Sequence, residues 1–298
     1  MTFQHKPSGI SRFMRLTALD WALLALLAVA LAWLYHRASG QLNYTWQWHR
    51  TFTLLFTPPR EGGLPYFFHG VLATIRISLW GMLLAFVLGA LLGFARFSRH
   101  ALWRVPATLY VLLVRNLPPL VFVFIFYYFV STRLLPALGL SQLFAYRGEV
   151  SGWVDVLFGA PRLWENTLSG VICVGLLSAA YMAEVVRAGL ASISHGQWEA
   201  AKSLGLKPWH QFRFVIMPQV LAAITPALAG QAISLVKDTS IVSLISIQEL
   251  TFVGNEMATS SNQFFEIWLV VGAVYFALCW SISWLFSVIE ARHMKHLQ

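Results

Sequence analysis

The chain has 298 residues, of which 58% are hydrophobic and only 11% are charged, against about a quarter charged in soluble domains. This composition excludes an ordinary soluble domain and indicates an integral membrane protein. The net charge of +9 would suggest a nucleic-acid partner in a soluble chain; here the basic residues flank apolar runs, so we assign them to membrane topology and expect no nucleic acid.

Residues 1–66 are predicted to form an N-terminal tail, an extra transmembrane anchor and a periplasmic loop. Basic residues precede an apolar run from Trp21 to Tyr35. We expect an uncleaved anchor, because the run is at the long end for a signal sequence. The small residues Ala38, Ser39 and Gly40 leave cleavage as the alternative. The polar and aromatic stretch up to Pro65 is typical of an extramembrane loop.

Residues 67–298 are predicted to form the main transmembrane domain, whose first span has its charge-free part from Ile77 to Ala95. Gly70, Thr74 and Ser78 recur at helical spacing, and such small residues allow close helix packing in lipid. Arg76 interrupts the start of this span. We interpret it as snorkelling to the outer interface.

The next span is predicted from about Val105 to Thr132 and contains Arg115, followed by Pro118 and Pro119. A charge within a span is expensive and usually faces a cavity or a partner. The prolines must break helical hydrogen bonding locally. Arg115 therefore has two interpretations: a polar group on a permeation path, or a structural residue that pairs with a neighbouring span.

The segment Arg133 to Arg162 is longer than an ordinary connector and holds an apolar patch, Leu134 to Tyr146, that is too short to cross. We predict a periplasmic insertion with an interfacial or re-entrant piece. Three more spans follow, with a mixed stretch to Asn262 before the last, and their predicted ranges are 166–183, 220–236 and 267–289. The predicted fold class is an all-α polytopic bundle of about six spans.

A polar loop between the fourth and fifth spans has the pattern helix, glycine, helix. Ser194 and Gln197 have the spacing of a capping box. Trp198, Ala201 and Leu204 would share one face of the first helix, as their spacing indicates.

The same loop carries the signals for a turn and a second helix. Gly205 is expected to end the first helix in a left-handed conformation. Pro208 suits the first turn of the next helix, where its missing N–H costs nothing. Two short amphipathic helices in a basic loop indicate a docking site for a soluble partner.

The spacing of Glu199-Ala200-Ala201, Gly205 and Pro218 resembles the EAA loop of ABC-transporter permease subunits, here residues 194–219. Val215 and Met217 conservatively replace the usual Ile and Leu. His195 stands where the amino-acid branch usually has proline, which weakens the predicted start of the first helix.

Two further segments resemble the polar amino acid uptake branch, the histidine-, glutamine- and glutamate-type permeases. One is Arg115 to Pro118 and the other is Lys237-Asp238-Thr239-Ser240. The resemblance covers about residue 70 to the end of the chain. It implies a type I ABC importer permease fold with a cytoplasmic coupling-helix loop, and a multi-pass protein of the bacterial inner membrane.

The resemblance also implies a function: permease subunit of an ATP-driven importer of polar amino acids, and not an enzyme. The implied partners are a cytoplasmic ABC ATPase dimer, a periplasmic solute-binding protein, a second permease copy, identical or related, an amino acid substrate, and membrane lipid. ATP and Mg would be bound by the ATPase, because no Lys of this chain follows a Gly and a P-loop is therefore excluded. The residues implied in ATPase coupling are Glu199, Ala200, Ala201, Gly205 and Pro218.

Four charged residues are candidates for a substrate path: Arg115, Glu184, Lys237 and Asp238. A zwitterionic amino acid needs an acceptor for its ammonium and a donor for its carboxylate, which these side chains supply. The alternatives are structural. Glu184 has Arg187 three positions on along its helix, and Lys237 with Asp238 would be an ion pair that ends a helix. The histidines show no metal-ligand spacing, so no metal is expected.

Topology follows from charge. Segments assigned to the inside carry twice as many Lys and Arg as those assigned outside, which predicts both termini and the docking loop in the cytoplasm. An ion-gradient-driven secondary transporter or channel is the alternative function. It would explain the charges within spans but not the docking loop, and no inverted repeat supports it.

Overall fold

The computed structural model describes residues 18–41, 44–59, 63–139 and 152–295. Within these ranges the chain has helices and no β-strand, which confirms the all-α class. Six helices are long and apolar enough to cross a membrane, as predicted: Ala18–Arg37, Tyr66–Phe97, Pro119–Ala137, Gly152–Ser192, Pro208–Ile245 and Phe264–Val288. The chain divides into two units, residues 1–47 and 48–298.

The described part of the first unit is mainly one helix, α1 (Ala18–Gln41). Its apolar side chains are exposed along its whole described surface, among them Leu26, Val29 and Trp33. A helix that is hydrophobic all round suits a membrane span. The basic residues Lys6, Arg12 and Arg15, on which the predicted orientation of this span partly depends, lie outside the described residues.

The second unit is built on α3 (Tyr66–Phe97) and α9 (Trp164–Ser192), which contact each other along their length. Small residues line the contact, among them Gly89 and Gly93. The predicted Gly70, Thr74 and Ser78 are buried, but Gly70 and Thr74 contact residues 249–253 instead of α9. A Cβ added at Gly89 would come within 2.7 Å of the Cβ of Met182. The two backbones therefore approach more closely than larger side chains would allow.

The predicted proline break is present. Helix α4 (Ala101–Asn116) ends before extended Leu117, because a residue before proline disfavours the helical conformation. Helix α5 (Pro119–Ile125) then begins on Pro119 and continues as the π-helical η2 (Phe126–Leu134) and α6 (Leu135–Ala137). The prediction of one span from 105 to 132 was wrong: the candidate span runs from Pro119 to Ala137, and α4 is a separate helix.

The insertion contains α8 (Gly152–Phe158) and the 3₁₀ turn η3 (Pro161–Leu163); residues 140–151, with much of the predicted apolar patch, lie outside the described residues. Arg76 donates to the carbonyl oxygens of Asp155 and Val156, at 2.7 and 2.9 Å. Instead of simply reaching toward solvent, its guanidinium caps the C-terminal carbonyls of α8 and fixes that helix against α3.

The fifth span consists of α11 (Pro208–His210), the π-helical η4 (Gln211–Ile216), α12 (Met217–Asp238) and the 3₁₀ segment η5 (Thr239–Ile245). The mixed stretch that follows contains an unpredicted helix, α13 (Leu250–Ser261). The Glu249 side chain caps it by accepting from the Phe252 N–H, and Asn262 ends it with φ 60°.

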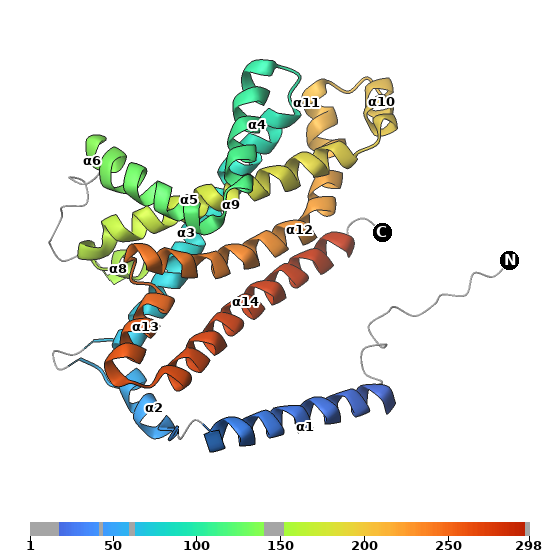
Figure 1. Cartoon of the computed structure of the whole chain (residues 1–298). Helices are drawn as coiled ribbons and strands as arrows, with labels where there is room; N and C mark the ends of the chain where they lie inside the picture. The colour runs from blue at the N-terminus through green and yellow to red at the C-terminus, as the bar shows by residue number, and fades with distance from the viewer. Residues whose placement is uncertain (1–17, 42–43, 60–62, 140–151, 296–298) are drawn as a thin grey trace. The chain divides into compact units, whose positions relative to one another are not determined.

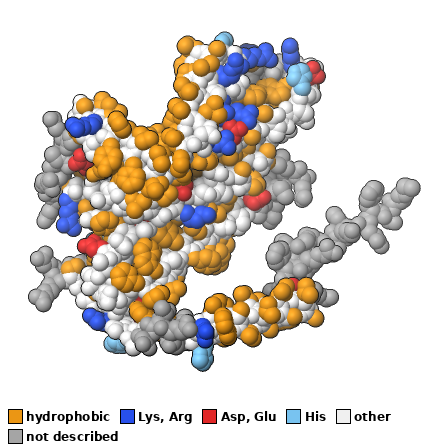
Figure 2. Space-filling view, in the orientation of Figure 1, with side chains coloured by type: hydrophobic (Ala, Val, Ile, Leu, Met, Phe, Trp, Pro, Cys, Tyr) orange, Lys and Arg blue, Asp and Glu red, His pale blue; other side chains and the backbone are white. Residues whose placement is uncertain are grey.

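The remaining helices are α2 (Trp48–Phe56) and the long α14 (Phe264–Lys295). In this unit α4, α11 and the docking helix α10 (His195–Ser203) stand at one end, and α2 and α13 at the other (Figure 1). Basic side chains gather at the α4 and α10 end, whereas hydrophobic side chains cover the middle (Figure 2). This distribution agrees with the cytoplasmic side predicted for the docking loop.

Candidate functional site

The first docking helix, α10, packs one face on the bundle. Ala201 is 1% exposed, and Trp198 packs against a buried cluster that includes Leu190, Ile216 and Val220. The predicted shared face is wrong for Leu204, which is 77% exposed. The reason is geometric: Leu204 still donates to the Ala200 carbonyl as in a helix, and six residues at about 100° each place it about 120° round the helix from Trp198.

The predicted capping box does not form. Ser194 occupies the N-cap position with extended backbone angles, but its side chain accepts no hydrogen bond from the helix. The Gln197 side chain instead accepts from Gln219 Nε2 at 3.3 Å. A contact with the start of α12 has thus replaced a local contact within α10.

The turn between the docking helices is the predicted one. Gly205 has φ +72°, and its N–H donates to the Lys202 carbonyl at 2.9 Å. A Cβ added there would meet no atom within 4 Å. The need for glycine is therefore conformational, because only glycine adopts this region without strain. Pro208 is the first residue of α11, as predicted.

Pro218 explains the π-helical segment before it. Proline has no N–H to donate to a carbonyl one turn back, so the hydrogen-bond ladder must change locally. The Met217 N–H donates to Phe212 O, five residues earlier. The helix widens between 211 and 216 without breaking, so that α11, η4 and α12 continue one another.

The outer face of the loop is exposed in the part of the chain that the structure describes. Glu199 and Ala200 are exposed, and the Glu199 carboxylate lies 3.1 Å from His195 Nδ1. Leu204 and Trp209 are large apolar residues on the same loop, and both are mostly exposed. Apolar residues rimmed by charge mark a protein-interaction surface.

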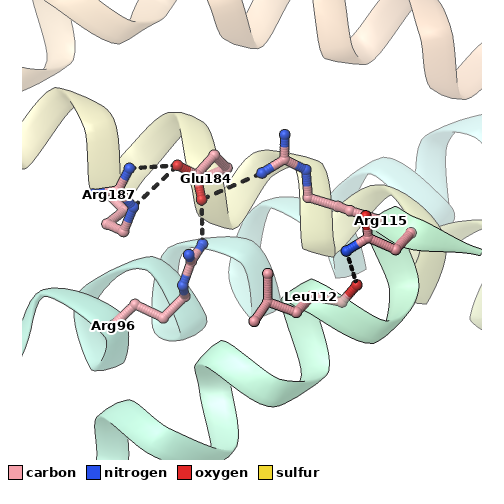
Figure 3. Close-up of polar contacts among 6 residues, drawn as sticks. Arg96, Leu112, Arg115, Glu184 and Arg187 are labelled. Atoms are coloured by element: carbon pink, nitrogen blue, oxygen red, sulfur yellow. Dashed lines mark hydrogen bonds and ion pairs between the residues drawn. The ribbon is translucent and has the colours of Figure 1, made fainter.

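A charged cluster lies near the docking loop and involves three helices (Figure 3). Glu184 of α9 forms ion pairs with Arg96 at the end of α3 and with Arg187 on its own helix. Arg115, at the end of α4, lies 3.4 Å from the same carboxylate and 5.8 Å from the centre of the Tyr181 ring.

The cluster has one negative and three positive groups, so it carries an excess of positive charge. The Arg96 side chain is only 11% exposed and that of Glu184 is 24% exposed, whereas Arg115 and Arg187 reach further into solvent. Ion pairs with this little exposure are screened less than surface pairs. Both structural alternatives are present here: Glu184 pairs with Arg187, and Arg115 pairs with a neighbouring helix.

Lys237 and Asp238 are not part of this cluster. They close α12, 20 residues beyond its start at Met217, which is about 30 Å along a helix. No ion pair joins their side chains in the described part of the chain. Thr239 and Ser240 hydroxyls instead donate to the Val236 and Lys237 carbonyls, each at 2.7 Å. The four predicted path residues therefore divide between two separate places in the bundle.

Glu249 has no predicted role, yet its side chain is fully buried. Its carboxylate accepts from Tyr275 Oη at 2.6 Å and from the Phe252 N–H at 2.9 Å. Thr74 donates to it at 3.4 Å and accepts from the Leu250 N–H at 3.0 Å. Burial raises the pKa of Glu249, against the smaller effect of these hydrogen bonds. An acidic residue just before an apolar run was the signal that could have identified it.

Comparison with known families decides the class. Residues 85–295 match the family described as binding-protein-dependent transport system inner membrane component. The chain belongs to this family. It is a multi-pass inner membrane component of a bacterial ABC transporter.

Named members of the family show the same relationship. The chain is 32% identical over 235 residues to the probable amino-acid ABC transporter permease protein YckA of Bacillus subtilis, covering 78% of this chain and 90% of that protein. It is 30% identical over 229 residues to the glutamate/aspartate import permease protein GltK of Escherichia coli, covering 77% and 94%. A chain in the crystal structure of an amino acid ABC transporter with histidines has a TM-score of 0.64 at 24% identity, covering 84% of this chain and all of that chain.

Proposed function

We propose that this permease translocates a polar amino acid across the bacterial inner membrane and that a separate ATPase drives it. The observation that carries the proposal is the docking loop: two short helices joined by a left-handed glycine, exposed between two spans, at the end rich in basic side chains. The names of the related permeases support an amino acid as the substrate. ATP and Mg would be held by the ATPase subunits.

The coupling residues have separate roles in this proposal. Glu199 and Ala200 present the contact surface, and Ala201 seats α10 on the bundle. Gly205 sets the angle between the two docking helices. Pro218 shapes the start of α12, which carries motion of the loop into the membrane. The ATPase dimer would contact the exposed face, and two permeases, identical or related, would share the two ATPase subunits.

Substrate handling is assigned to two places. The excess positive charge around Glu184 would attract a substrate carboxylate at the cytoplasmic end of the path, through Arg115 in particular. Partly buried Asp238, with exposed Lys237, would serve the opposite end. A periplasmic solute-binding protein would deliver the substrate to that side.

Transport in vesicles tests the proposal. The tagged permease is purified from its native membrane with the subunits that accompany it, and is then reconstituted with the binding protein. We expect ATP inside the vesicles to drive uptake of a labelled polar amino acid, and an ion gradient without ATP to drive none. Uptake by an ion gradient alone would instead favour a secondary transporter.

A further inference from the structure

An apolar groove of about 720 Å³ lies between α3, α8 and α9. Eleven residues line it, and all except Thr167 are apolar. On α3 they are spaced at one helical face, from Trp80 to Val87, and on α9 they run from Trp164 to Ile172. The volume is within the range of about 300–1,000 Å³ that holds small ligands.

Helix α8 closes one end of the groove. Phe158 stacks on Trp80, with ring centroids 5.1 Å apart, and Trp80 Nε1 donates to the Leu157 carbonyl at 3.1 Å. Arg76 donates to the Asp155 and Val156 carbonyls. Together these hydrogen bonds satisfy the carbonyl groups at the C-terminal end of α8. The insertion therefore forms a fixed roof over the groove, and its exposed Trp153 suits the membrane interface.

The depth of the groove matches one leaflet of the membrane. Helix α9 starts at the outer interface if the docking loop at its other end is cytoplasmic. From Trp164 to Ile172 it descends eight residues, which is about 12 Å at 1.5 Å per residue. The groove thus begins under the roof at the headgroup level and extends toward the middle of a bilayer whose hydrocarbon core is about 30 Å thick.

The size of the groove argues against a protein occupant. A stable protein interface uses about 20–30 residues on each side, and eleven residues line this groove. The roof also covers the end at which a second permease helix would have to continue toward the outer surface. An acyl chain is not limited in these two ways, because it needs no large interface and can bend to fit under α8.

We propose that this groove binds acyl chains of an outer-leaflet phospholipid. The walls offer dispersion contacts, because the indole N–H groups of Trp80 and Trp164 already donate to the Leu157 and Gly159 carbonyls. Thr167 is the remaining polar side chain among the lining residues, so recognition is by chain shape and length. None of the eleven lining residues is charged, and the nearby Asp155 and Arg162 line a separate cavity. The site therefore selects no headgroup charge.

A photoreactive lipid tests the proposal. The complete transporter is reconstituted in bilayers containing phosphatidylethanolamine with a diazirine in the acyl chain, illuminated and digested, and the adducts are located by tandem mass spectrometry. We expect adducts to concentrate on the groove residues of α3 and α9. Unlabelled phosphatidylethanolamine and phosphatidylglycerol should compete equally well.

Filling variants provide the matched comparison. Leu83→Trp and Val87→Trp place bulk in the groove from positions about half exposed, and Leu79→Trp and Leu91→Trp add the same bulk at exposed sites of α3 outside it. The groove variants should reduce groove adducts at least fivefold, and the control variants should not. If adducts form equally on all faces of α3, the lipid is unspecific annular lipid and the proposal is wrong. Disulfide crosslinks that place a second permease over the groove would also overturn it.

Discussion

At the scale of single residues, Glu184 is the carboxylate on which three helices converge. Removing its charge would leave the three guanidinium groups near one another without a partner. We expect Glu184→Gln to lower the free energy of unfolding by about 1–2 kcal/mol, a modest value because Arg115 and Arg187 are partly exposed. Thermal unfolding in detergent measures this change, and ATP-driven uptake should fall with it.

Glu165→Gln is the control for that variant. Glu165 lies on the same helix, in its first turn, and is exposed. It should retain the stability and uptake of the unmodified protein. An equal loss in both variants would show that the Glu184 cluster contributes nothing of its own.

Glu249 leads to a prediction about pH. Because burial raises its pKa, the folded protein binds a proton that the unfolded chain releases at lower pH. The resulting stabilisation is complete below the ordinary glutamate pKa of about 4.3 and is lost as pH rises through the higher folded value. We expect Glu249→Gln to flatten the dependence of Tm on pH above about 4.3. An unchanged slope would show that Glu249 does not titrate differently in the folded state.

At the scale of elements, the turn at Gly205 joins α10 and α11, which move together under the proposed coupling. Valine at φ +72° is strained, by about 1–3 kcal/mol, although space for its side chain is available. We expect Gly205→Val to insert normally and to hydrolyse ATP, but to lose most of its uptake. The assay measures hydrolysis and uptake on the same vesicles.

Gly196→Ala is the matched control, because Gly196 lies within α10 in ordinary helical conformation with open space around it. It should leave uptake intact or slightly stabilise the loop. Normal uptake by Gly205→Val would refute the coupling role of this turn.

Local chemistry explains which elements were predictable. The glycine turn, the start on Pro208 and the break before Pro118 depend on neighbours in sequence, and all three are present. The capping box predicted at Ser194 does not form, and the Gln197 side chain instead accepts a hydrogen bond from Gln219, 22 positions away. The pairing of Arg96 with Glu184 spans 88 positions, and no sequence spacing could indicate it. Helix α13 was missed because its cap, Glu249, is also a buried residue in a network with α3 and α14.

At the scale of the whole molecule, sidedness is the property on which the assignments to outer and inner ends depend. Cys173 is buried and Cys279 partly exposed, so both are replaced by alanine before new cysteines are introduced. We expect a membrane-impermeant maleimide to label Lys202→Cys, on the docking helix, only in inside-out vesicles. Trp153→Cys on α8 should be labelled only in right-side-out cells. The reverse pattern would place the docking loop outside and contradict the proposed coupling.

The absence of a break between Pro208 and Asp238 has a mechanical consequence. Because α11, η4 and α12 follow one another without interruption, they form one continuous helical segment of 31 residues. This segment is bent and not straight (Figure 1), as Pro226 inside α12 leads one to expect. Under the proposed coupling, displacement of the docking loop moves the part before the bend, and the stiffness of the bend decides how much of that motion reaches Lys237 and Asp238.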